Sequence, residues 1–112
     1  PPISVLPSLA DSMLDVTSAT HLIFFSWLDQ ADRTVRAKPA KLDGVMRGVF
    51  ATRTQDRPNP IGMSIVKLLE CAGTTLRTSG LDCLDGTPLL DIKPYLPNND
   101  SYPEASVAWN KS

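Results

Sequence analysis

Two arginines lie in a polar loop that the sequence makes stiff. The loop is part of residues 48–64, GVFATRTQDRPNPIGMS, and carries Arg53 and Arg57 before a Pro-Asn-Pro run at residues 58–60. Because the two prolines restrict the backbone and remove two N–H donors, this loop cannot continue as a helix or as an interior strand. A guanidinium group offers a planar fork of donors, which suits a carboxylate, a phosphate or a flat base. The alternative is that both arginines are solvated or bond to local carbonyls.

A second polar stretch, residues 81–88, carries two carboxylates around a turn. Its sequence, LDCLDGTP, contains Asp82 and Asp85, and the Asp-Gly pair that begins at Asp85 is typical of a turn. Both carboxylates can therefore face one pocket from a loop. An ionised Asp in such a loop accepts hydrogen bonds from ribose hydroxyls, from an amine or from backbone amides. The alternative is structural, with Asp85 making an Asx turn and Asp82 capping a strand end.

Short apolar runs predict the strands that position these two loops. Residues 21–28, HLIFFSWL, form the most apolar run, and its short length and three aromatic residues favour a buried strand. Residues 61–71 and 74–79 are interpreted as a β-hairpin, and residues 89–92 as a further short strand. Residues 48–51 are interpreted as a strand-like start to the arginine loop.

The remaining segments predict little regular structure. Residues 3–6 are a β-like run, and residues 9–14 suit one or two helical turns with Ser8 as the N-cap. Residues 29–44 are polar and are interpreted as a surface loop with a single helical turn. The tail from Pro94 is rich in Pro and Asn and is expected to be irregular. Short strands, turn signals and little helix predict an all-β or β-rich single domain.

Length and charge limit the class of protein. The chain has 112 residues and a formal net charge of −1, which indicates one domain without the overall basic character of many nucleic-acid-binding proteins. Seven Lys and Arg residues nevertheless fall between positions 33 and 57, enough for a local phosphate-binding field. Cys71, Cys83 and the single His21 are too few for a metal site. We expect free thiols, no metal, no membrane span and a cytoplasmic protein.

The two loops together resemble those of a known enzyme family. Residues 48–64, followed by GLDCLDGTPLLDIKPYLP at residues 80–97, are similar to the TsaA-like or TrmO family of tRNA methyltransferases, and the resemblance covers roughly residues 20–105. It implies a small single-domain β-barrel over residues 1–112 that uses S-adenosylmethionine. The substrate that it implies is N6 of threonylcarbamoyladenosine at position 37 of tRNA, in the anticodon loop. It also implies a homodimer, with the cofactor near the dimer interface.

Matching residue to residue, the resemblance implies three sets of site residues. The cofactor-binding set is Asp29, Gln30, Arg53, Met63, Asp82, Cys83, Leu84 and Asp85. The catalytic set is Asp82 and Asp85, as carboxylates that accept the departing N6 proton or stabilise the cation. The set for RNA contact or for organising the loop is Arg57, Asn59 and Lys93. Within the cofactor set, Arg53 is expected to bind the cofactor carboxylate and Met63 to pack on its adenine.

The sequence also departs from the family pattern. Asp29 stands where many relatives have His, and the loop over residues 29–47 is shorter than in many relatives. The additional N-terminal strand and the Pro-Arg-Gln-type segment of the family are not visible before Ile3. The alternative function is therefore a non-catalytic S-adenosylmethionine- or nucleotide-binding module derived from that family, and a third is an interaction domain without a ligand. A hydrolase using Ser64 or His21 lacks a nucleophile motif.

Overall fold

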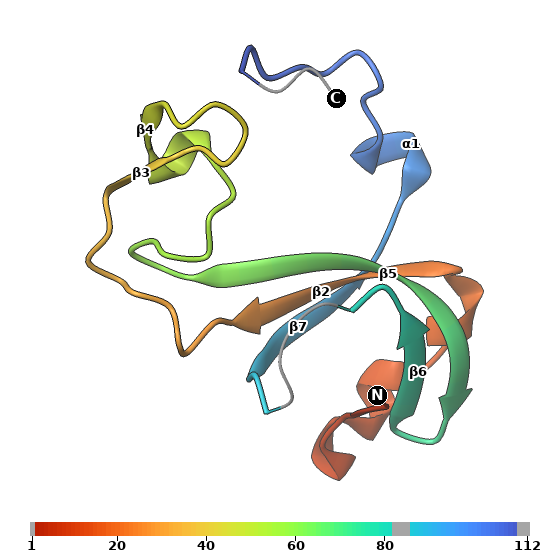
Figure 1. The fold of residues 1–112 in the computed structure, drawn as a ribbon. Helices are drawn as coiled ribbons and strands as arrows, with labels where there is room; N and C mark the ends of the chain where they lie inside the picture. The colour runs from red at the N-terminus through yellow and green to blue at the C-terminus, as the bar shows by residue number, and fades with distance from the viewer. Residues whose placement is uncertain (1, 82–85, 110–112) are drawn as a thin grey trace.

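The chain folds into a curled antiparallel sheet with short helical segments at its margins (Figure 1). This computed structural model describes residues 2–81 and 86–109. The strands are β1 (Ile3–Ser4), β2 (His21–Trp27), β3 (Ala37–Pro39), β4 (Met46–Gly48), β5 (Ile61–Ala72), β6 (Thr75–Ser79) and β7 (Leu89–Pro94). The helical segments are the 3-10 helices η1 (Pro7–Met13), η2 (Val16–Ser18) and η3 (Val49–Ala51) and the α-helix α1 (Pro97–Asp100).

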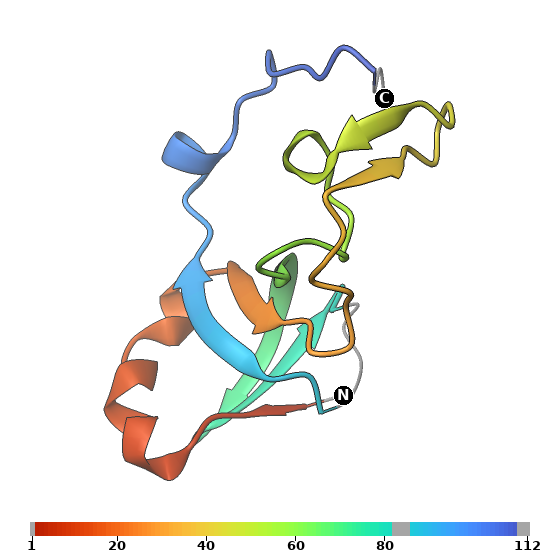
Figure 2. The same ribbon diagram turned by 90° about the vertical axis from the view of Figure 1, so that its left-hand side faces the viewer.

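The larger sheet is a half-barrel. Within the described residues it has five strands in the order β1-β6-β5-β2-β7, and each neighbouring pair is antiparallel. Because β1 and β7 are its two edges, the sheet curls without closing (Figure 1 and Figure 2). β3 and β4 form a separate hairpin beyond one end of the half-barrel. The prediction of a small, β-rich barrel fold with short helical turns is confirmed in this half-barrel form.

One face of β2 forms the centre of the core. Leu22 and Phe24 alternate along this strand and pack with Val66 of β5 and Leu76 of β6, each at most 2% exposed. The N-terminal segment packs against the same cluster. Fully burying an apolar side chain of this size stabilises a fold by about 1.5–3 kcal/mol. The prediction of a buried strand over residues 21–28 is confirmed.

The opposite face of the sheet leaves apolar side chains half-exposed. Ile61, Met63 and Ile65 alternate along β5 and are 50%, 44% and 49% exposed. They lie in register opposite the half-buried residues of β2, Trp27 among them. A contiguous apolar face of this kind is typical of a surface that another molecule covers.

The segment after β2 contains a hairpin where the sequence predicts a surface loop over residues 29–44. β3 pairs with β4 in antiparallel register, with Lys38 opposite Arg47. The Ala40 amide donates to the Val45 carbonyl at 3.0 Å and extends the pairing towards the turn. Most side chains of these strands are exposed and no apolar alternation marks them, so the periodicity that identifies β2 is missing here.

The strand-like start expected at residues 48–51 is wrong. β4 ends at Gly48, and the chain turns at once into η3 (Val49–Ala51). The Val49 side chain is only 3% exposed, and its amide donates to the Arg36 carbonyl at 2.9 Å. The apolar residue is therefore buried by a tight turn instead of by strand pairing, and this turn leads the chain into the arginine loop.

The segments before β2 and after β7 differ in detail from the prediction. η1 begins at Pro7 with Leu6 at its N-cap, so Ser8 is inside the helix and does not cap it. Proline suits this first helical position because its φ is already helical. The tail contains the short helix α1 (Pro97–Asp100) within the stretch expected to be irregular. In the described part of the chain, no helix combines the length and the apolar character that crossing a bilayer requires.

Candidate functional site

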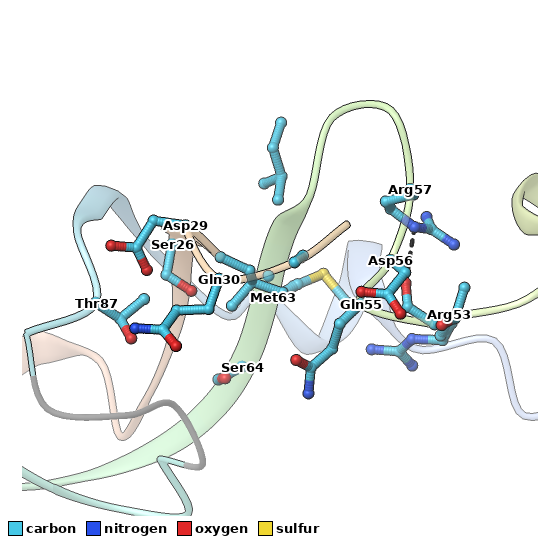
Figure 3. Close-up of a pocket in the computed structure, with 15 residues that line it drawn as sticks. Ser26, Asp29, Gln30, Arg53, Gln55, Asp56, Arg57, Met63, Ser64 and Thr87 are labelled. Carbon is cyan, nitrogen blue, oxygen red and sulfur yellow. Dashed lines mark hydrogen bonds between the residues drawn. The ribbon is translucent and has the colours of Figure 1, made fainter. Parts of the chain in front are cut away.

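A cavity of about 470 Å³ lies at the end of the half-barrel where β2 stops and β5 starts. We call it the strand-end cavity. Its walls come from the turn that follows β2, from the arginine loop at residues 53–57, from the first residues of β5 and from Thr87 (Figure 3). Figure 3 shows polar side chains from the β2 turn on one side of Met63 and those of the arginine loop on the other. Segments far apart in the sequence thus form one concave polar site.

The structure brings together every predicted cofactor-binding residue that it describes. Asp29, Gln30, Arg53 and Met63 all line the strand-end cavity. The other four, Asp82, Cys83, Leu84 and Asp85, lie outside the described residues, and so does the predicted catalytic pair among them. Thr87, two positions after that segment, lines the same cavity. The binding and catalytic roles of these residues stay predictions.

Arg53 is the cation of this cavity that is available to a ligand. Its side chain is exposed, and it makes no hydrogen bond or ion pair with another residue in the ranges 2–81 and 86–109. It lies on the same wall as Gln55 and Asp56 (Figure 3). A guanidinium without a protein partner can direct its donor fork at a bound carboxylate or phosphate.

Arg57 has a different role, because its guanidinium is bonded to the protein backbone. It donates to the Thr54 carbonyl at 2.9 Å and also to the carbonyls of Val49 and Thr52. These three bonds close the chain between η3 and the prolines into one compact loop. The sequence left two roles open for these arginines, binding a ligand or bonding to local carbonyls. Arg57 bonds to local carbonyls. Arg53 makes no such bond within the described residues, so its donors remain available for a ligand.

A third arginine, Arg33, which the sequence motifs did not single out, joins the segment after the arginine loop to the end of β2. Arg33 donates through Nε to the Pro58 carbonyl at 2.8 Å and through a terminal nitrogen to the Asn59 side-chain oxygen at 3.3 Å. Its guanidinium carbon lies 5.2 Å from the centre of the Trp27 ring, within cation–π range. Asn59 is thereby held by the protein itself. The only sequence signal for this contact is the general enrichment in cations.

Asp56 fixes the other side of the loop. Its carboxylate accepts a hydrogen bond from the Lys38 ammonium at 2.6 Å and another from the Asp32 backbone amide at 2.9 Å. The Lys38 bond, followed by the Asp32 amide bond, holds the pKa of the Asp56 carboxyl below its usual value. The lowered pKa makes Asp56 a weaker base than an unpaired Asp, and its bonds to Lys38 and Asp32 position this cavity wall.

Lys93 and His21 lie away from this cavity. Lys93 is on β7, with its ammonium 5.8 Å from the centre of the Phe25 ring. It is therefore not grouped with Arg57 and Asn59, the other residues predicted for RNA contact or for loop organisation. His21 begins β2 at the end remote from the cavity, and its Nδ1 lies 2.9 Å from the Thr20 hydroxyl.

Gly62 lets the end of β2 pack closely against β5, which leads to a stability prediction. A Cβ at this position would lie 2.8 Å from the buried Ser26 Oγ and 3.2 Å from Leu28 Cδ2. We expect Gly62→Ala to lower the free energy of unfolding by about 1–3 kcal/mol, as overpacking does elsewhere. Urea denaturation measures this change. The matched control is Gly48→Ala, where the nearest atom is 3.9 Å away, and equal stability of the two variants would contradict the prediction.

The chemistry of the strand-end cavity suits a polar ligand with both charges. It offers an available cation in Arg53, an exposed carboxylate in Asp29, an amide in Gln30 and the thioether of Met63 as an apolar surface. Among the described residues, no three His, Cys, Asp or Glu side chains gather as a metal site does. Fold and cavity together describe a small β-rich domain with a concave polar site.

Comparison with known proteins gives the family. Residues 2–101 match the tRNA-methyltransferase O N-terminal domain. A protein of Archaeoglobus fulgidus named "Probable S-adenosyl-L-methionine-binding protein" is 46% identical over 107 residues, which are 96% of this chain and 29% of that protein. The tRNA (adenine(37)-N6)-methyltransferase of Escherichia coli is 43% identical over 113 residues, covering 92% of this chain and 47% of that enzyme.

A solved structure agrees with these sequence relatives. The crystal structure of TrmO from Pseudomonas aeruginosa matches with a TM-score of 0.77 at 34% identity, over 96% of this chain and 46% of that one. The chain spans less than half the length of each of these three relatives. It belongs to the tRNA-methyltransferase O N-terminal domain family, as its two loop motifs indicate.

Proposed function

We propose that this chain is the cofactor-binding and methyl-transfer domain of a tRNA adenine-N6 methyltransferase. The proposed reaction moves a methyl group from S-adenosylmethionine to N6 of threonylcarbamoyladenosine at position 37, in the anticodon loop of tRNA. One observation carries the proposal: Asp29, Gln30, Arg53 and Met63, which come from three separate segments, line a single cavity. The relative from Escherichia coli, 43% identical, bears the name of a tRNA (adenine(37)-N6)-methyltransferase.

The residues of the strand-end cavity fit the parts of S-adenosylmethionine. That molecule carries a carboxylate, an ammonium group, ribose hydroxyls and a flat adenine. Arg53 suits the carboxylate and Asp29 the ammonium group or the hydroxyls, since these pairs have opposite charge or complementary hydrogen bonding. The Met63 thioether suits an aromatic ring.

The chain's own contribution to the reaction is mainly alignment. S-adenosylmethionine supplies an electrophilic methyl group when it is bound. N6 of an acylated adenosine is a poor nucleophile, so the protein must hold it in line with that group, and such alignment can lower a barrier by several kcal/mol, up to roughly 7–11. Asp56 holds the cavity wall, and its bond to Lys38 lowers the pKa of its carboxyl, which makes it a weaker proton acceptor than an unpaired Asp. The predicted proton acceptors are Asp82 and Asp85.

A homodimer and a cytoplasmic location are parts of the same proposal. The half-exposed face of β5, with Ile61, Met63 and Ile65, continues into the strand-end cavity through Ile61 and Met63. A second copy that covers this face would bury apolar surface and exclude water from the methyl-transfer site. The cytoplasm supplies both tRNA and the methyl donor.

The proposed reaction is tested by nucleoside mass analysis. The protein is incubated with S-adenosylmethionine and with tRNA that bears unmethylated threonylcarbamoyladenosine, while calorimetry measures cofactor binding. We expect a gain of one methyl group on that nucleoside. Matched tRNA without the threonylcarbamoyl group is the substrate control. Cofactor binding without methyl gain would assign the non-catalytic binding module instead, and the absence of both would overturn the proposal.

A further inference from the structure

The β3–β4 hairpin and its flanks contain most of the positive charge of the chain. Residues 33–57 hold seven of the 11 Lys and Arg residues and two of the 12 Asp and Glu residues. The rest of the chain holds four cations and ten acidic residues. The nearly neutral net charge therefore conceals one strongly basic region, and such a local field attracts polyanions at ranges up to about a Debye length, roughly 8–10 Å.

Four of these seven cations already have a protein partner that occupies their charge or their donors. Arg33 and Arg57 bond to carbonyls of the arginine loop. Lys38 and Arg47 are paired with Asp56 and Asp43 at 2.6 Å and 2.8 Å. Both carboxylates of the region are thus neutralised by these pairs, and the Arg47 hydrogen bond lowers the pKa of Asp43 to about 2.

The other three cations are the ones that a ligand can use. Arg36 bonds through a single terminal nitrogen to the Arg33 and Val35 carbonyls, whereas Arg33 and Arg57 each use Nε and a terminal nitrogen, so Arg36 keeps more of its donor fork for a ligand. Lys41 and Arg53 make no hydrogen bond or ion pair with any residue of the described ranges, and both side chains are exposed. The region therefore keeps an excess of unpaired positive charge at the surface.

A second cavity, which we call the hairpin cavity, lies between this hairpin and the arginine loop. It measures about 830 Å³, and Lys38, Lys41, Arg53 and Trp109 are among its lining residues. It shares the wall formed by residues 53–56 with the strand-end cavity. A ligand in the hairpin cavity is therefore next to a ligand in the strand-end cavity, with Arg53 on the wall between them.

The C-terminal segment completes the hairpin cavity with an aromatic side chain. Trp109 lies against β4, and the Arg47 guanidinium carbon is 5.0 Å from the centre of its ring. Figure 2 shows this segment running back from α1 to the hairpin. The cavity thus combines cations with an aromatic wall, a combination typical of nucleic-acid-binding surfaces.

We propose that the β3–β4 hairpin and the hairpin cavity bind the phosphate backbone of the RNA strand next to the nucleoside that is methylated. The inference rests on the proposed function, because it takes the strand-end cavity as the methyl-donor site. Charge complementarity selects a polyanion, and the shared wall places that polyanion beside the transferred methyl group. An acidic protein segment would also match the charge, but only RNA accounts for a basic cavity that adjoins the proposed methyl-donor site.

The hairpin is better suited to this contact than the residues that the resemblance implies. Arg57 and Asn59 are occupied within the arginine loop, and Lys93 lies over the Phe25 ring on another part of the sheet. Lys41 has neither constraint and belongs to a cavity beside the proposed site of reaction. We therefore expect Lys41 to contribute more to RNA affinity than Lys93.

The test is a charge reversal at Lys41 with a matched reversal elsewhere. We expect Lys41→Glu to weaken tRNA binding at least about tenfold and to reduce the salt slope of log Kd by about one, since one phosphate contact is lost. Lys67→Glu makes the same charge change at an exposed position of β5. Its Kd for tRNA should stay within about twofold of the wild-type value. Fluorescence anisotropy between about 50 and 200 mM salt measures both, and calorimetry with S-adenosylmethionine should give unchanged affinity for both.

Several results would overturn this assignment. Equal weakening by the two reversals would show a general charge effect, and no weakening by Lys41→Glu or no tRNA binding by wild type would remove the site. Loss of binding to an acidic peptide, with tRNA binding kept, would assign a protein partner. The proposed reaction can fail while this inference stands. In that case the wild-type protein binds tRNA, Lys41→Glu weakens the binding, and no methyl group is transferred.

Discussion

Replacing Arg57 with alanine should destabilise the arginine loop and abolish cofactor binding together. The guanidinium donates to the carbonyls of Val49, Thr52 and Thr54, and the one other described side chain bonded to any of these is the Thr52 hydroxyl, which donates to the Val49 carbonyl at 3.3 Å. A hydrogen bond from a charged group contributes about 1.5–3 kcal/mol, so losing two or three should lower the free energy of unfolding by at least about 3 kcal/mol. Urea denaturation measures the stability, and calorimetry measures S-adenosylmethionine binding.

The conservative variant separates geometry from charge at this position. Arg57→Lys keeps one positive charge but has no planar fork to serve three carbonyls, so its stability should lie between wild type and Arg57→Ala. A protein that stays stable after Arg57→Ala and loses only tRNA affinity would show that Arg57 contacts RNA. That outcome would contradict the structural role that the three carbonyl bonds indicate.

The sequence predicts the strands of the half-barrel well because each has a local signal. β2 is short, aromatic and buried on alternate residues, and β5 and β6 flank a turn at Gly73, whose φ of +62° suits glycine. The β3–β4 hairpin lacks that signal, because its strands are only three residues long, are mostly exposed and show no apolar alternation, and because its Lys38 pairs with Asp56, 18 positions further along the chain. Propensity and periodicity cannot reveal a hairpin of this kind.

In the site, the sequence predicts which residue types are present but not the role of each residue. Residue types alone predict that Arg53 and Arg57 hold an anion, a base or local carbonyls, because both stand in one loop with the same chemistry. Only the folded chain places three carbonyls around one guanidinium and leaves the other towards a cavity. The role of Arg33 could not be predicted from the sequence either, because its partners Pro58 and Asn59 lie 25 and 26 positions further along the chain.

Replacing Arg53 with alanine should weaken cofactor binding while leaving the fold intact. The side chain is exposed and bonds to no residue within the described ranges, so Tm should not change. If its guanidinium binds the carboxylate of S-adenosylmethionine, the lost charge-assisted bond contributes about 1.5–3 kcal/mol, which corresponds to roughly a tenfold to hundredfold rise in Kd. Calorimetry and a thermal melt measure the two quantities on the same sample.

Two further variants make the Arg53 result specific. Arg53→Lys keeps the charge without the donor fork, so its affinity should fall between those of wild type and Arg53→Ala. Arg77→Ala removes an arginine from β6, where its exposed pair with Glu70 is remote from the cavity, and should leave cofactor affinity unchanged. Unchanged affinity in Arg53→Ala would exclude this carboxylate contact. Because Arg53 also lines the hairpin cavity, loss of tRNA affinity alone would then place Arg53 on the RNA side of the shared wall.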